Sequence, residues 1–171
     1  MKSVPSGGCS TSQFIVSPSN ETPAMSDEVV DLLEQAYLDE VETVMNYLAN
    51  AIYLETFDGE DVAEDLMEDV QEELGHAEEL GYRLRYYGRV PPASMDFEPA
   101  QEMLQPPADS TDVETIVDGV IEAEEDAIET YEALIDAAEE AGDPVTADLA
   151  TELLADEQAH KAAFLSIKKS F

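Results

Sequence analysis

The chain has 171 residues, of which 41 are Asp or Glu and only 7 are Lys or Arg, so its formal net charge is −34. This length suits a single domain with a sizeable core, and an apolar content of 44% is too high for a wholly disordered acidic chain. Because the chain lacks a basic patch, neither nucleic acid nor an anionic membrane surface is an expected partner. The single cysteine, Cys9, excludes an internal disulfide and a Cys-x-x-Cys metal site.

The large excess of acidic side chains indicates a halophilic protein, because a salt-rich cytoplasm screens the self-repulsion of such a surface. A field of this sign also attracts metal cations, and the two interpretations are compatible. Apolar runs fall short of the roughly 18–20 residues that cross a bilayer. The N-terminus also lacks the pattern of a secretory signal. We therefore expect a soluble, cytoplasmic protein.

The first half of the chain predicts a tail and two helices. Residues 1–26 are rich in Ser, Pro, Gly and Thr without apolar periodicity, which predicts a flexible tail. Apolar residues recur every three or four positions over about 27–57 and again over about 60–87, as helix faces require. Asp58-Gly59 separates these two helices, and Gly88 ends the second.

The second half predicts a long connection and another pair of helices. Residues 89–111 hold five prolines and predict an irregular segment. Helices follow over about 112–141 and 144–169, with Asp143 as the cap and Pro144 in the first turn of the last one. The sequence therefore predicts an all-α four-helix bundle of two antiparallel hairpins joined by a long crossover.

Both histidines of the chain follow a glutamate by three residues. Glu73 and His76 lie in the second predicted helix, and Glu157 and His160 lie in the fourth. Residues at i and i+3 share a helix face, so each pair can present a carboxylate and an imidazole to one point. One such pair alone is weak evidence in a glutamate-rich helix, but both pairs lie on the apolar side of their helices.

The two hairpins repeat each other at an offset of 84 residues, as a site with two-fold pseudosymmetry requires. Glu42 and Asp126 also match, but they point away from the apolar faces, and we rank them lower as ligands. Among the candidate site residues, the same residue type recurs at four pairs of positions: Glu40 and Glu124, Tyr47 and Tyr131, Glu73 and Glu157, His76 and His160.

Glu40 and Glu124 lie on the apolar faces of the first and third predicted helices, with no Lys or Arg close by in the sequence. Burying such carboxylates without a partner is costly. A bound metal removes this cost. The alternative is a metal-free helical bundle, which would have to accommodate four buried carboxylates.

These residues resemble those of the ferritin-like di-iron carboxylate proteins, which comprise ferritins, bacterioferritins and rubrerythrins. That class takes one Glu from each of two helices and Glu-x-x-His from each of the other two. The resemblance covers residues 27–169 and implies a ferritin-like bundle that holds two iron ions, as Fe2+ or Fe3+. It implies that Glu73 and Glu157 bridge the ions and that Tyr47 and Tyr131 take part by reaching ligand carboxylates. The implied ligands are Glu40, Glu73, His76, Glu124, Glu157 and His160.

A histidine ligand needs an acceptor for its other ring nitrogen. Glu72 and Asp156 match at the same offset and are candidates for this role, although both are equally consistent with ordinary solvated carboxylates.

At three points the sequence differs from particular members of this class, which limits the members that it can resemble. Leu74 stands where a haem-binding bacterioferritin has Met, so no haem is expected. Ala127 stands where rubrerythrin has a seventh glutamate, and the paired cysteines of a rubredoxin domain are missing. The chain is therefore similar to rubrerythrin in its bundle only, without the built-in electron donor.

The main hypothesis is an enzyme, a di-iron oxidoreductase of ferroxidase or peroxidase type that oxidises Fe(II) with O2 or H2O2. It would draw on an unidentified electron donor and form a homo-oligomer, a dimer or larger. One alternative is an iron-storage ferritin subunit with a mineral core. Another is a dimanganese, catalase-like protein, because carboxylate-rich sites accept iron and manganese alike.

Overall fold

The computed structural model describes residues 27–57 and 59–170, which form four long helices and one short one. The long helices are α1 (Asp27–Tyr53), α2 (Glu60–Tyr86), α3 (Val113–Ala141) and α4 (Pro144–Lys168), and the 3-10 helix η1 spans Glu102–Leu104. The described residues contain no strand, which confirms the all-α prediction. The predicted tail with Cys9, and Asp58, lie outside the described residues.

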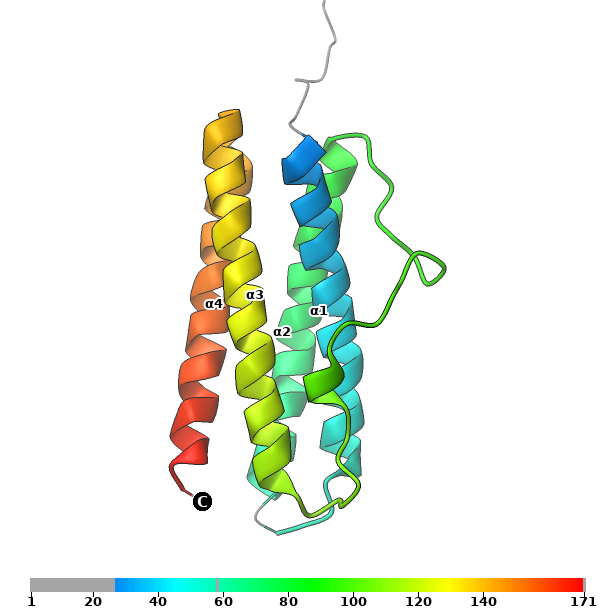
Figure 1. The fold of residues 1–171 in the computed structure, drawn as a ribbon, viewed down its shortest axis with the longest axis vertical. Coiled ribbons are helices and arrows are strands. Elements are labelled where there is room, and N and C mark those ends of the chain that lie inside the picture. Colours follow the sequence, from blue (N-terminus) through cyan, green and yellow to red (C-terminus); the bar gives the residue numbers. More distant parts are fainter. Residues whose placement is uncertain (1–26, 58, 171) are drawn as a thin grey trace, which may run out of the picture.

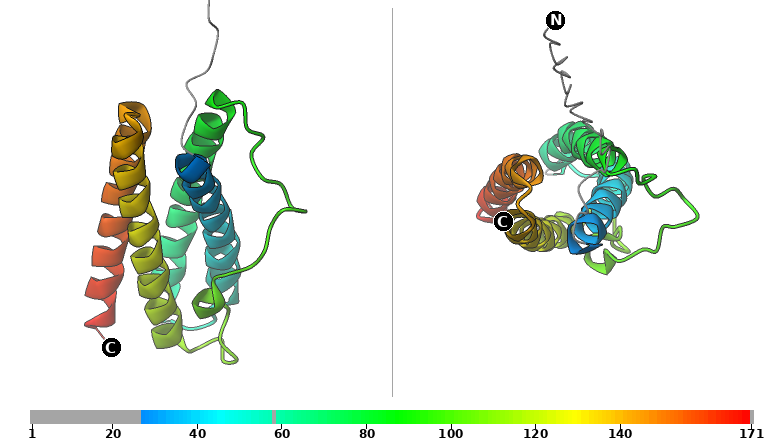
Figure 2. Two further views of the ribbon diagram at one scale, coloured as in Figure 1. Left: turned by 45° about the horizontal axis from the view of Figure 1, so that its top comes forward. Right: turned by 90° about the horizontal axis from the view of Figure 1, so that it is seen from above.

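The four helices form two antiparallel hairpins that lie side by side (Figures 1 and 2). α1 packs along α2, α3 packs along α4, and the hairpins meet through α1 with α3 and α2 with α4. The crossover leaves the end of α2, passes outside α1 and enters α3 at the opposite end of the bundle (Figure 1). This is the predicted connectivity. None of the helices in the described residues is long and apolar enough to cross a membrane.

α1 ends at Tyr53, four residues before the expected boundary at about 57. The amide of Leu54 still donates to the carbonyl of Asn50, but that of Glu55 donates to the carbonyl of Ser110, at 3.0 Å. The backbone therefore leaves the helix to pair with the end of the crossover. The spacing of apolar residues along a helix cannot predict such long-range pairing. The ends of the other helices lie within one residue of the expected bounds.

The bundle core has two apolar layers separated by a polar one. One layer joins the end of α1 to the starts of α2 and α3 and the end of α4, and includes Leu66 and Phe164. The other joins the opposite ends of the same helices, and includes Leu33 and Leu134. Two buried histidines and four buried glutamates lie between these two layers: Glu40, Glu73, His76, Glu124, Glu157 and His160. Apolar packing thus seals the polar centre along the bundle axis.

The crossover is held against the bundle by buried polar contacts and close packing. Glu42 is only 3% exposed and accepts hydrogen bonds from the backbone amides of Ala100 and Gln101. Further along, a Cβ at Gly119 of α3 would lie 2.4 Å from the carbonyl oxygen of Met103. Only glycine therefore permits this approach. The structure gives Glu42 a role that the sequence did not suggest, which is to fix the crossover on α1.

A polar cluster ties the end of α2 to the turn between α3 and α4. Asp143 caps α4, as predicted, and it also accepts hydrogen bonds from Arg83 and Tyr87 of α2. Burial alone would raise the pKa of Asp143, but hydrogen bonds from Thr146, Tyr87 and Arg83 outweigh burial and lower it to about 2. The charged form of Asp143 is therefore the stabilising one.

We expect Asp143→Asn to lower the free energy of unfolding by about 1–2 kcal/mol at pH 7, because the charge that accepts from Arg83 and Tyr87 is lost while asparagine still caps the helix. Because the pKa is lower in the folded chain, the contribution is complete above the ordinary value of 3.8 and disappears as the pH falls toward 2. Urea denaturation of both proteins at several pH values measures this difference. A difference that persists unchanged below pH 3 would contradict the charge-based explanation.

Candidate metal centre

All four long helices contribute to one buried cluster at mid-bundle. Glu73 and Glu157 are each only 1% exposed, and the remaining members are also buried. The cluster unites every residue predicted as a ligand: Glu40 from α1, Glu73 and His76 from α2, Glu124 from α3, Glu157 and His160 from α4.

The cluster divides into two overlapping groups, in each of which the potential ligand atoms lie within 4.8 Å of one another. Glu73 and Glu157 belong to both groups. Glu40 and His76 complete the first group, and the second has the matching pair from the other hairpin: Glu124 and His160. This overlap is what two neighbouring metal positions sharing two carboxylates require.

The two imidazole rings face the shared carboxylates through the same nitrogen. His76 Nδ1 lies 3.0 Å from a Glu73 oxygen and 3.1 Å from a Glu157 oxygen. His160 Nδ1 lies 3.3 Å and 3.4 Å from oxygens of the same two residues. The rings are stacked with centroids 6.4 Å apart. The four groups therefore converge from α2 and α4 on one central space.

The outer nitrogens of the two rings face acidic residues of the opposite hairpin. His160 Nε2 lies 3.3 Å from Glu72, and His76 Nε2 lies 3.6 Å from Asp156. These are the two acceptors that the sequence suggested. A carboxylate there favours the tautomer that leaves Nδ1 free for a metal. Asp69, 3.9 Å from His160 Nε2, was missed, although it lies one helical turn before Glu73.

Two tyrosines hold the remaining carboxylates from the neighbouring helix. The hydroxyl of Tyr47 in α1 donates to Glu124 in α3, and the hydroxyl of Tyr131 in α3 donates to Glu40 in α1. Both rings are buried. The contacts expected from the family resemblance therefore form, and each joins one hairpin to the other.

Without a metal, the pKa values in the cluster are strongly displaced. Burial, followed by the charges of Glu73 and Glu157, raises the pKa values of Glu40 and Glu124. Burial lowers the pKa of the two histidines, but the nearby carboxylates of Glu157 and Glu73 outweigh it and raise both pKa values, that of His76 to about 10. Protons thus neutralise part of the negative charge that gathers here.

Several atoms of the cluster lack a hydrogen-bond partner although they are buried. They are Glu73 Oε1, both carboxylate oxygens of Glu157 and His160 Nδ1. Buried polar atoms are normally paired, and unpaired ones are costly. Four carboxylates and two neutral imidazoles carry a charge of −4, which two divalent cations balance. The donor set therefore fits a pair of divalent transition metals.

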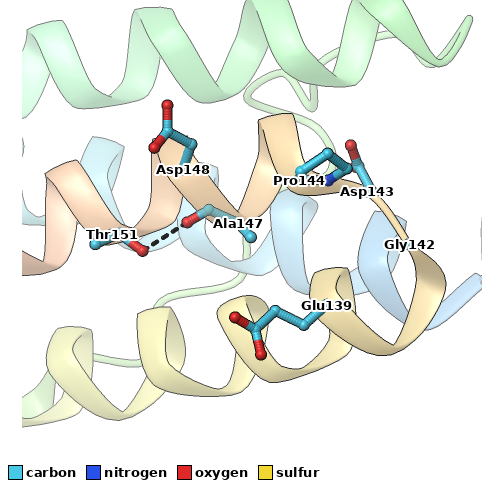
Figure 3. A pocket seen from close by; sticks show the side chains of 7 residues that line it. All are labelled: Glu139, Gly142, Asp143, Pro144, Ala147, Asp148 and Thr151. Carbon is cyan, nitrogen blue, oxygen red and sulfur yellow. Dashed lines mark hydrogen bonds between the residues drawn. The ribbon is translucent and has the colours of Figure 1, made fainter.

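A cavity of about 410 Å³ lies at the turn between α3 and α4 (Figure 3). Its wall includes Glu139, Asp143 and Asp148, and Thr151 donates a hydrogen bond to the Ala147 carbonyl beside it. None of the six clustered residues and no histidine lines it. This cavity is therefore separate from the buried cluster of glutamates and histidines.

A family model described as the ferritin-like domain matches residues 30–169. No curated protein matches the sequence. Solved structures with the same fold include the bacterioferritin of Desulfovibrio desulfuricans, described with its diiron site in different catalytic states. That protein is 24% identical with a TM-score of 0.73, and the match covers 84% of this chain and 79% of that one.

Two further structures show the same fold at lower identity. The bacterioferritin of Rhodobacter capsulatus, described with a metal-free dinuclear site and haem iron, is 21% identical with a TM-score of 0.72, over 84% of this chain and 85% of that one. A ferritin-like, diiron-carboxylate protein of Bacillus anthracis is 18% identical with a TM-score of 0.74, over 83% and 96%.

Proposed function

Because the chain belongs to the family of ferritin-like domains, we propose that it is a non-haem di-iron oxidoreductase that oxidises Fe(II) with O2 or H2O2. One observation carries the proposal. Glu73 and Glu157 lie in both ligand groups, are almost wholly buried, and have carboxylate oxygens without hydrogen-bond partners. A cation bound between them would pair these oxygens and offset the cost of their burial.

In this proposal Glu40 and His76 would hold one iron and Glu124 and His160 the other, with Glu73 and Glu157 shared between the two positions. Iron bound there would supply the electrons that reduce the oxidant. One O2 that takes two electrons and two protons becomes H2O2. One H2O2 that takes two electrons and two protons becomes two molecules of water.

The surrounding residues position the ligands. Tyr47 and Tyr131 donate to the terminal carboxylates and so restrict their rotation. Glu72 and Asp156 orient the imidazole rings through their outer nitrogens. Metal ligation requires deprotonated carboxylates and neutral imidazoles, so Glu40, Glu124 and both histidines release protons when the ions bind.

We expect anaerobically purified, metal-free protein, mixed with two Fe(II) per chain and then with air, to form ferric iron much faster than buffer does. Stopped-flow absorbance follows this reaction, and parallel runs with H2O2 identify the oxidant. His160→Ala removes one ligand and is expected to slow the reaction by at least about 100-fold. A parent protein that oxidises iron no faster than buffer would falsify the ferroxidase proposal.

The same experiment separates the alternatives. Continued uptake of iron far beyond two ions per chain would favour the storage function. If the iron reaction fails, loading with manganese and a peroxide assay test the catalase-like function, since a carboxylate-rich site accepts both metals. Leu74 is half-exposed on α2, and the expected absence of haem stays a prediction that absorbance of the purified protein tests.

A further inference from the structure

A cavity of about 190 Å³ lies on the face that α1 shares with α3. Asp39 and Thr43 of α1 and Asp126 and Ala127 of α3 line its two sides, and Gln101 of the crossover forms part of its wall. One member of the metal cluster, Glu40, also lines it. The cavity therefore reaches from an acidic surface to the first carboxylate of the centre.

The cavity adjoins a smaller internal space of about 10 Å³ among the clustered carboxylates. Glu40, Thr43, Ala123 and Ala127 line both. The inner space is also bounded by Glu73 and Glu157, the buried residues whose oxygens lack partners. The residues of α3 that line both spaces are the two alanines, whose side chains are short.

Other directions toward the cluster are filled by side chains. Apolar layers close the bundle above and below it. On the opposite face, between α2 and α4, the rings of His76 and His160 stand between the central carboxylates and the half-exposed Asp156 and Glu72. His160 Nε2 lies 3.3 Å from Glu72, and His76 Nε2 lies 3.6 Å from Asp156. The α1 and α3 face, in contrast, carries a cavity that reaches Glu40 of the cluster.

We propose that divalent cations reach the metal centre through this α1/α3 cavity, with Asp39 and Asp126 attracting the cation and Ala127 leaving the passage open. A carboxylate-lined recess with low-dielectric walls concentrates cations and raises their association rate. The inference rests on the proposed metal centre, but it concerns how the ion arrives and not what reaction follows.

Gln101 holds the crossover side of this passage. Its side-chain amide donates to the Thr43 hydroxyl at 2.7 Å and its side-chain oxygen accepts from Asn46. Glu42 fixes the Gln101 backbone amide at the same time. Because the crossover forms one wall, the two hairpins and the connection between them all contribute to the access route.

The test uses Co(II), which has an absorption band when coordinated and does not reduce O2 under these conditions. In stopped-flow mixing with the metal-free full chain, Ala127→Leu is expected to slow association about tenfold or more, with the final number of bound ions unchanged. The double variant Asp39→Asn/Asp126→Asn is expected to slow it about tenfold at low salt, and the difference should shrink near 1 M salt, where charges are screened.

Matched controls come from a neighbouring cavity between the same helices, lined by Asp31, Ala133 and Asp136. Ala133→Leu and Asp31→Asn/Asp136→Asn change the same residue types, and both are expected to keep the parent rate. Circular dichroism checks that each variant folds. If Ala127→Leu does not fold, the double variant Asp39→Asn/Asp126→Asn tests the access route.

Parent rates in folded Ala127→Leu, or in the Asp39 and Asp126 variant at low salt, would overturn the access route. A lower final number of bound ions with an unchanged association rate would also overturn the route, since the substituted residues would then act in metal binding and not in passage of the ion. Failure of the parent to bind Co(II) overturns the route and the metal centre together. Normal Co(II) association without iron oxidation, in contrast, supports the route and removes only the proposed reaction.

Discussion

Replacing Glu73 by glutamine is expected to weaken both metal positions, whereas replacing Glu40 by glutamine weakens only one. Glu73 belongs to both ligand groups, whereas Glu40 belongs only to the group that contains His76. A neutral amide lacks the charge that balances the cations, so we expect at least about a 100-fold loss of affinity at each position affected. Titration with Co(II) then gives two ions per chain for the parent, about one for Glu40→Gln and none for Glu73→Gln.

Glu42→Gln provides the control for this comparison. Glu42 is also a buried glutamate of α1, but it accepts hydrogen bonds from crossover amides and belongs to neither ligand group. Its replacement is expected to leave two Co(II) per chain. If Glu73→Gln and Glu40→Gln lost the same number of ions, the assignment of Glu73 as a shared ligand would be wrong.

Loading with metal is expected to stabilise the fold strongly. A ligand that binds only the folded state adds RT ln(1 + [L]/Kd), or about 4 kcal/mol per site at a thousandfold excess over Kd. Two sites would add about 8 kcal/mol, a rise in melting temperature of roughly 15–30 °C for a domain of this size. Thermal denaturation of the metal-free and Co(II)-loaded chain measures the difference.

The stabilisation should depend on pH in a defined direction. Burial and the charges of Glu73 and Glu157 raise the pKa values of Glu40 and Glu124, so metal and protons compete for these carboxylates. Stabilisation by metal is therefore expected to grow as the pH rises and to shrink in acid. Glu73→Gln serves as the comparison, since its melting temperature should barely respond to Co(II). An equal response in parent and variant would place the stabilising ions elsewhere.

The helical architecture was predictable because its signals are local. Apolar spacing located the four helices, and five prolines located the crossover between them. The cap at Asp143 followed from its position before Pro144. The end of α1 was not predictable, because the amide of Glu55 pairs with Ser110, far away in the sequence.

The sequence by itself also determined the membership of the cluster. Two Glu-x-x-His pairs, and the offset that adds Glu40 and Glu124, singled out the residues that the structure brings together. This was possible because each ligand must lie on the apolar face of a regular helix, and the spacing of apolar residues in the sequence identifies that face. The ligand roles of these residues stay predictions that the metal titrations test.

Only the tertiary structure decided how the hairpins meet. It decides which glutamate each tyrosine contacts, assigns Glu42 to the crossover, and opens a cavity beside Ala127. These features depend on distances between side chains that are far apart in sequence. No local pattern contains such distances, because helix packing and the path of the crossover set them.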